Sequence, residues 1–287
     1  MELRGEMIHR NWKGSALLLF IFIGMMLCLP ALDLAQGDPW EKIDEGLFWA
    51  EFDPVLRYSA TEPKVVVIKI DPRYYAFKLL CASEHERDRF TARGWCKKKN
   101  LIAAINAGMY QEDGFTNVGY MKNFAHVNNR RLNLTYQSVV AFNRIEAAVP
   151  EIQVIDLKCQ NFEELKAKYQ TFVQNIRMIS CRQENVWSKQ DKRWSLAVLG
   201  IDKTGNALFI FSEGPYSGHE FNNILLSLPI SIFNATYLEG GPQASLYLSA
   251  NGIQLDKVGT HEAGPEEGRV RAIPSLLPNV IGIERKF

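Results

Sequence analysis

The sequence predicts an α+β fold, in which one domain holds a mixed, largely hairpin-built β-sheet and two or three packed helices behind an N-terminal hydrophobic segment. Short runs rich in β-branched and aromatic residues outnumber helical ones, with about ten strands expected. Glycine and asparagine turns join many of these runs directly, whereas a doubly wound fold would alternate strands with helices. The chain shows no repeat or low-complexity linker after residue 40, so we expect residues 37–287 to form one domain.

The first half of this domain is expected to begin with a β-hairpin. Residues 64–71 and 74–82 are both β-rich, and only a Pro-Arg link separates them. A helix is predicted within the charged residues 83–100. Residues 101–110 predict a buried strand that ends at Asn106, because an Ala-Gly pair follows it.

The second half is expected to contain two helices between hairpins. Residues 161–174 predict an amphipathic helix, because Asn161 can cap it and apolar residues follow at helical spacing. Residues 217–228 predict another helix. Hairpins are predicted at residues 193–214 and 244–256, which turn at Lys-Thr-Gly-Asn and Asn-Gly. Further strands are predicted at residues 137–143, 152–157, 235–241 and 279–285.

The charge balance argues against a nucleic-acid partner. The chain carries 33 basic and 32 acidic residues, for a formal net charge of +1. A nucleic-acid-binding protein would need a clustered basic face, and no segment of the sequence supplies one.

The N-terminal segment, residues 1–36, predicts export. Basic residues between Arg4 and Lys13 precede an apolar run at residues 15–32, which is the order of an export signal. The same run is long enough to cross a bilayer, and its basic flank would keep the N-terminus in the cytoplasm. We therefore expect either a cleaved signal peptide or an uncleaved membrane anchor, with the remainder of the chain in the periplasm or on the extracytoplasmic face of the membrane.

Export changes the expectation for the cysteines. Cys81, Cys96, Cys159 and Cys181 follow the N-terminal segment, and an even number of cysteines in an oxidising compartment predicts disulfides. Three pairings are conceivable, and the simplest joins sequence neighbours as Cys81–Cys96 and Cys159–Cys181. The alternative is four buried free thiols. The sequence contains no CxxC pair, so the cysteine spacing does not predict a zinc site.

Candidate site residues lie where predicted strands end. Loops at such positions can direct polar side chains from a rigid support, and Asn106, His126, Arg177, Glu213 and Glu239 all occur there. Two carboxylates, such as Glu213 and Glu239, suit glycoside hydrolysis. The alternative is structural, since an asparagine before Ala-Gly commonly bonds its own backbone in a turn.

Four segments in order resemble the phosphodiester glycosidase family, in an exported bacterial branch. The resemblance covers residues 65–248, and its most specific parts are the Asn-Ala-Gly-Met strand end and the strand that ends in Leu-Glu-Gly-Gly. The family usually has Asp where this chain has Glu239, lacks the inserted Pro242 and Gln243, and often has Arg at the position of Leu196. The segments are INAGMYQEDGFTNVGYMKN, FVQNIRM, GIDKTGNALFIFSEGPYSGHEFNNILLSL and ATYLEGGPQASLYL.

The resemblance implies a hydrolase that cleaves the glycosidic C–O bond of a sugar phosphodiester. Glu239 would position water or the sugar, with Asn106 and His126 as its hydrogen-bonding partners, and an arginine fork would bind the phosphate. The other residues expected to bind substrate are Gly108, Arg177, Arg193, Glu213, Gly240, Gly241 and Ser245. No cofactor is predicted, although the acidic turn could offer oxygen atoms to a divalent cation. The alternative is a non-catalytic envelope protein that binds a glycan or a partner through the same pocket.

Overall fold

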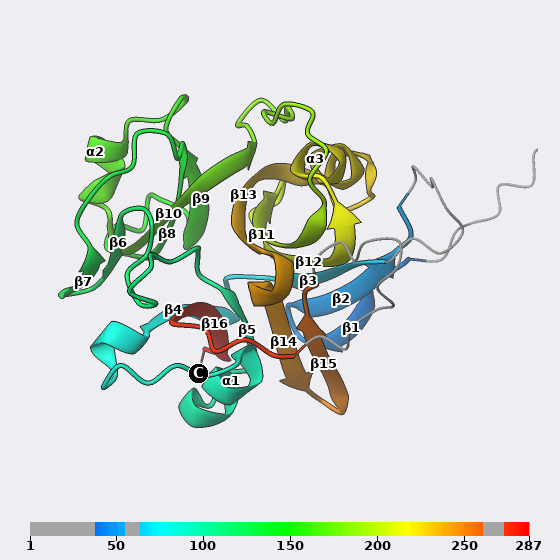
Figure 1. The fold of residues 1–287 in the computed structure, drawn as a ribbon, viewed down its shortest axis with the longest axis horizontal. Coiled ribbons are helices and arrows are strands. Elements are labelled where there is room, and N and C mark those ends of the chain that lie inside the picture. Colours follow the sequence, from blue (N-terminus) through cyan, green and yellow to red (C-terminus); the bar gives the residue numbers. More distant parts are fainter. Residues whose placement is uncertain (1–37, 55–63, 261–272, 287) are drawn as a thin grey trace, which may run out of the picture. The chain divides into compact units, whose positions relative to one another are not determined.

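Two antiparallel β-sheets form the framework of the described chain (Figure 1). The computed structural model describes residues 38–54, 64–260 and 273–286, and these belong to one compact unit that begins at Asp38. The predicted export segment lies outside the described residues. Within them, no helix is both long enough and apolar enough to span a membrane.

The strands are β1 (Glu41–Asp44), β2 (Leu47–Phe52), β3 (Val65–Ile70), β4 (Tyr75–Cys81), β5 (Ala103–Asn106), β6 (Met121–Asn123), β7 (His126–Asn129), β8 (Ser138–Arg144), β9 (Ile152–Asp156), β10 (Tyr169–Ile179), β11 (Trp194–Asp202), β12 (Ala207–Tyr216), β13 (Ile232–Gly240), β14 (Ser245–Ala250), β15 (Ile253–Val258) and β16 (Asn279–Arg285). The helices are α1 (Ala92–Lys99), α2 (Phe162–Lys166) and α3 (Gly218–Ser227), with 3₁₀ turns η1 (Ala82–Glu84) and η2 (Gly241–Gln243). The described part of the chain is therefore rich in sheet and carries three short α-helices.

The larger sheet has the strand order β1-β2-β3-β12-β11-β13-β10-β6-β7, and β8 joins it by pairing with β10 and β9. The smaller sheet has the order β15-β14-β5-β16-β4. The main apolar core lies between them, with Phe77 and Ile105 of the smaller sheet in the same cluster as Phe209 and Leu238 of the larger one. Because both sheets contribute side chains to this core, residues that are far apart in the sequence lie close together in the fold.

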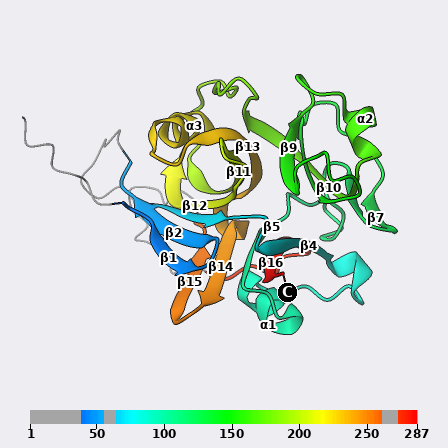
Figure 2. The same cartoon turned by 180° about the vertical axis from the view of Figure 1, so that it is seen from behind.

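The helices cover apolar faces away from that core (Figures 1 and 2). Phe221 and Leu225 of α3 pack on the larger sheet, and Trp95 of α1 packs in the cluster on the smaller one. α3 starts at Ser217, whose hydroxyl accepts a hydrogen bond from the Glu220 backbone N–H while the Glu220 carboxylate accepts one from the Ser217 N–H. The predicted helix over residues 217–228 is thus confirmed, with a local cause.

Several predicted strands and hairpins are confirmed. β11 pairs with β12 around the Lys-Thr-Gly-Asn turn, and β14 pairs with β15 around Asn251 and Gly252. Both turn residues of the second hairpin have positive φ, of 45° and 84°, which asparagine and glycine tolerate best. β5 ends at Asn106 as expected, and β16 matches the strand predicted at the C-terminal end.

The hairpin predicted for residues 64–82 is wrong. β3 pairs with β2 and β12 in the larger sheet, whereas β4 pairs with β16 in the smaller one. The short link between them turns through a hydrogen bond from the Tyr74 N–H to the Asp71 carbonyl and carries the chain from one sheet to the other. The sheet is also not mixed, because every pairing between described strands is antiparallel.

The helix predicted for residues 161–174 ends early. Asn161 caps α2 as predicted, but the helix stops at Lys166 and the chain enters β10 at Tyr169. This segment contains the β-branched Thr171 and Val173 and pairs with β8 and β6. Hydrogen bonds on both sides of the strand outweigh the helical spacing of its apolar residues.

One of the two predicted disulfides is present. Cys159 and Cys181 are joined, with their Cα atoms 6.6 Å apart, whereas Cys81 and Cys96 are free and buried. The predicted Cys81–Cys96 pairing is wrong. Cys81 faces the core between the two sheets, whereas Cys96 of α1 packs in a different cluster on the smaller sheet, so the two thiols do not meet.

Candidate active site

The carboxyl group of Glu239 lies at the end of β13, a central strand of the larger sheet. Glu239 is opposite Ala197 of β11 and is only 8% exposed. Burial raises the pKa of Glu239 to about 7, and a hydrogen bond of 3.1 Å from the Gly240 backbone N–H to Oε1 offsets part of that rise. Among the described residues, no basic side chain forms an ion pair with it. A carboxyl group with this pKa can accept or donate a proton near neutral pH.

The two glycines after Glu239 are needed for different reasons. A Cβ on Gly240 would lie 2.2 Å from the Tyr237 hydroxyl and 2.3 Å from Cδ1 of Trp194, so only glycine fits. Gly241 has a φ of +63°, in the left-handed region that glycine adopts without a steric penalty. The turn therefore packs tightly on aromatic side chains on one side and bends sharply on the other.

Asn106 fastens this turn to the smaller sheet. Its Nδ2 donates to the Gln243 carbonyl at 2.9 Å, and its Oδ1 accepts from the Ser245 N–H at 2.7 Å. The Ser245 hydroxyl also donates to the Gln243 carbonyl, at 3.2 Å. Asn106 is 2% exposed, so these contacts account for both polar atoms of its amide. In this structure Asn106 positions the turn that follows Glu239.

Two tyrosines lie close enough to Glu239 for its charge to raise their pKa values. Burial, and then the negative charge of Glu239, raise the pKa of Tyr110. The same two causes, in the same order, raise the pKa of Tyr237. The ring of Trp187 packs on Tyr237 with its centroid 5.6 Å away. Glu239 therefore lies in an aromatic environment that also carries phenolic hydroxyl groups.

Arg89 brings a positive charge near one of these tyrosines, Tyr110. The positive charge of Arg89 lowers the pKa of Tyr110, whereas the negative charge of Glu239 raises it. Both charged groups therefore lie near the Tyr110 hydroxyl. Arg89 is exposed, and its guanidinium is 5.4 Å from the centroid of the Phe115 ring. No described carboxylate pairs with it. The sequence did not distinguish Arg89, because it lies in a run of charged residues.

Gly108 lies where the loop after β5 meets β10. A Cβ at this position would be 2.5 Å from Oδ1 of Asn175 and 2.6 Å from Oδ1 of Asn117, so a larger residue would displace both amides. Asn175 is held in place because its Nδ2 donates to the Ala107 carbonyl at 2.8 Å. Within the described chain neither amide oxygen has a hydrogen-bond partner.

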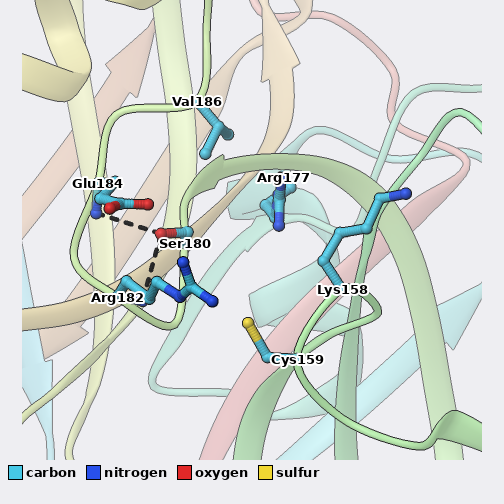
Figure 3. A pocket seen from close by; sticks show the side chains of 7 residues that line it. All are labelled: Lys158, Cys159, Arg177, Ser180, Arg182, Glu184 and Val186. Atoms are coloured by element: carbon cyan, nitrogen blue, oxygen red, sulfur yellow. Dashed lines mark hydrogen bonds between the residues drawn. The ribbon is translucent and has the colours of Figure 1, made fainter.

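Arg177 lies in a separate hollow (Figure 3). Its Nη1 bonds both carboxylate oxygens of the buried Asp156, at 2.8 and 3.1 Å. In β10 it pairs with Thr236, three positions before Glu239 in β13. The hollow has a volume of about 240 Å³. Its lining residues are Lys158, Cys159, Arg177, Ser180, Arg182, Glu184 and Val186.

Three other candidates have contacts away from Glu239. Arg193 pairs with Glu220 at the start of α3. His126 lies in β7, and its Nε2 is 2.9 Å from the Ser83 hydroxyl. Glu213 lies in β12, but its side chain is outside the described residues.

The structure thus joins one group of the predicted residues and separates another. Gly240, Gly241 and Ser245 lie in or directly after the turn that follows Glu239, and Asn106 of β5 is hydrogen-bonded to that turn. The arginines and the histidine chosen from the sequence are bonded to Asp156, Glu220 and Ser83 instead. Tyr110 and Tyr237, which lie near Glu239, and Arg89, which lies near Tyr110, were missed, because only the folded chain brings these segments together.

Known structures share this fold. A hypothetical protein from Synechocystis has a TM-score of 0.60 at 15% identity, and this chain is covered over 87% of its length but spans 64% of that protein. The zebrafish N-acetylglucosamine-1-phosphodiester alpha-N-acetylglucosaminidase catalytic domain, auto-inhibited by its pro-peptide, has a TM-score of 0.62 at 14% identity, with 86% of each chain covered. No curated protein matches the sequence.

A family model agrees with the resemblance found in the sequence. The model for phosphodiester glycosidases matches residues 99–283, which is more than half of the chain. The matched region includes Asn106, the Glu239 turn and most of β16. This chain therefore belongs to the phosphodiester glycosidase family, a family of hydrolases.

Proposed function

We propose that this protein is an exported hydrolase that cleaves the glycosidic bond of a sugar phosphodiester in an envelope glycan or a related molecule. The observation that carries the proposal is the buried carboxyl group of Glu239, whose pKa is raised to about 7 at a turn the family match includes. The zebrafish protein named above acts on an N-acetylglucosamine-1-phosphodiester, so N-acetylglucosamine is the first sugar to test.

In the proposed reaction, the ionised carboxylate of Glu239 accepts a proton from water. The water oxygen forms a bond to the anomeric carbon, and the bond from that carbon to the phosphate oxygen breaks with its electron pair on the phosphate. The products are a free sugar and a phosphate monoester. A phosphate is already a good leaving group, so this scheme needs little general-acid help and no cofactor. Tyr110, which is partly exposed, offers its hydroxyl group for a hydrogen bond to the sugar and its ring as an apolar surface.

An oxygen-18 experiment tests the reaction class. The protein is incubated in oxygen-18 water with UDP-N-acetylglucosamine and with a simple alkyl phosphodiester of N-acetylglucosamine 1-phosphate. Mass spectrometry is expected to find the label in the released sugar, because water attacks carbon. Label in the phosphomonoester would mean attack at phosphorus and would contradict the proposal. Sugar binding without turnover over a broad panel would instead favour the non-catalytic glycan-binding protein.

Arg89 is proposed to bind the phosphate. Arg89→Ala is expected to raise KM for the phosphodiester about tenfold with little change in kcat, since a hydrogen bond to a charged group contributes about 1.5 kcal/mol. Arg87→Ala is the matched control, because Arg87 lies over the same Phe115 ring, 4.1 Å from its centroid, but is not among the charges that act on Tyr110. Equal effects of both substitutions would mean that only the overall positive charge matters.

A further inference from the structure

We propose that Cys81, Glu84 and His126 form a zinc site on the side of the molecule where β4 ends and β7 begins. The Cys81 sulfur, a carboxylate oxygen of Glu84 and an imidazole nitrogen of His126 all lie within 4.8 Å of one another. These are the three ligand types that zinc accepts in proteins. None of the three lies in the Glu239 turn, so the inference is independent of the proposed hydrolase activity.

The spacing suits a four-coordinate ion with one open position. Around tetrahedral zinc with one sulfur ligand, ligand atoms are about 3.3–3.5 Å apart, given bonds of about 2.0 Å to nitrogen and oxygen and about 2.3 Å to sulfur. The observed upper limit of 4.8 Å therefore has to shrink by about 1 Å. Glu84 can supply this movement because it is exposed, whereas Cys81 is fully buried and fixed by the core. The Cys81 thiol is not in a disulfide, because Cys96, its predicted partner, packs in a different cluster.

Hydrogen bonds around the cluster orient two of the proposed ligands. Nε2 of His126 is 2.9 Å from the Ser83 hydroxyl, which in turn accepts a hydrogen bond of 2.9 Å from Asn128 Nδ2. Asn123 Nδ2 donates to Glu84 Oε2 at 2.9 Å and leaves the other carboxylate oxygen available. Metal ligands in proteins are typically held by such outer hydrogen bonds. Zinc binding would tie together β4, η1 and β7.

A second sulfur atom beside Cys81, that of Met121, favours a transition metal over calcium or magnesium. The Met121 sulfur is 3.7 Å from the Cys81 sulfur and is completely buried. Hard cations take oxygen ligands only, so a thiol with a thioether beside it disfavours them. The carboxylate and the imidazole favour zinc over copper(I), which prefers sulfur ligands.

The test is direct metal binding by the purified full chain after chelator treatment and gel filtration. Isothermal titration with zinc is expected to give one ion per chain, and Glu84→Gln, His126→Ala and Cys81→Ser are each expected to weaken binding at least a hundredfold. Asn123→Ala is expected to weaken it about tenfold, as loss of an outer partner typically does. The control substitutions Cys96→Ser and Glu86→Gln should leave the affinity unchanged, since one changes the other free thiol and one a neighbouring exposed acid.

A cobalt(II) spectrum provides the second readout. The cobalt-loaded protein is expected to show a thiolate-to-cobalt charge-transfer band that is absent in Cys81→Ser. If Cys81→Ser fails to fold, Glu84→Gln and His126→Ala still test the site, because neither residue is buried. Absence of stoichiometric zinc, zinc binding that survives these two substitutions, or tight binding of copper(I) without zinc would each overturn the proposal.

Discussion

Glu239→Gln is expected to lower kcat for the sugar phosphodiester by between 10² and 10⁴, the range that loss of a general base typically produces. Glutamine keeps the size of the side chain but cannot accept the proton of water. In the unsubstituted protein, kcat is expected to rise with pH through about 7, because only the ionised carboxylate is active. Steady-state kinetics between pH 5 and pH 9 on both proteins would measure this.

The same substitution is expected to stabilise the fold at high pH. The pKa of Glu239 is about 7 in the folded state and 4.5 in the reference state, so between these values the folded protein holds a proton that the unfolded chain has released. Stability falls as the pH rises through this window, by about 3 kcal/mol in total at 1.36 kcal/mol per pKa unit. Below pH 4.5 both states are protonated and the loss disappears.

Urea unfolding at pH 4, 6 and 8 would measure the effect. Glu239→Gln should match the unsubstituted protein at the lowest pH and exceed its stability increasingly at higher pH. Glu163→Gln is the control, because it makes the same chemical change at an exposed position on α2. An unchanged kcat for Glu239→Gln would remove its catalytic role, whereas an unchanged pH dependence of stability would contradict the raised pKa.

Asp156→Ala is expected to destabilise the protein by about 3 kcal/mol, because it leaves the largely buried Arg177 guanidinium without its counter-ion. The Asp156 carboxylate also accepts hydrogen bonds from the backbone N–H groups of Lys158 and Cys181. It therefore connects β10 to both ends of the disulfide-closed loop. Denaturant unfolding monitored by tryptophan fluorescence would measure the loss.

A second substitution separates the charge from the packing. Asp156→Ala combined with Arg177→Met removes both charges, and we expect it to recover part of the lost stability. The control is Glu163→Ala, which removes an exposed pair with Lys166 and should cost less than about 1 kcal/mol. If Asp156→Ala costs no more than this control, the pair does not stabilise the fold. Arg177→Met alone also tests whether this arginine contributes to phosphate binding, through KM.

The sequence by itself determined the elements whose causes are local. α3 follows from a capping box formed by residues three apart, and the β14–β15 hairpin follows from the tolerance of Asn251 and Gly252 for positive φ. The glycine turn after Glu239 was recognisable for the same reason. The order of these segments was also enough to indicate the phosphodiester glycosidase family, which the family match confirms.

Only the tertiary structure decided which strands share a sheet. β3 and β4 are both β-rich and almost adjacent, yet they lie in different sheets, because their pairing partners come from distant parts of the chain. Residues 169–174 form a strand because β8 and β6 supply hydrogen bonds on both sides. The face of β4 on which Cys81 lies excluded its predicted disulfide.

The site shows the same division. Local sequence placed an acid before two glycines, but the raised pKa of Glu239 comes from burial, which depends on everything packed around β13. An arginine looks the same in a sequence whether it is paired or free, and only the fold gave Arg177 to Asp156 and brought Arg89 near Tyr110. Turn geometry depends on one or two residues, whereas burial and charge pairing depend on contacts between distant segments.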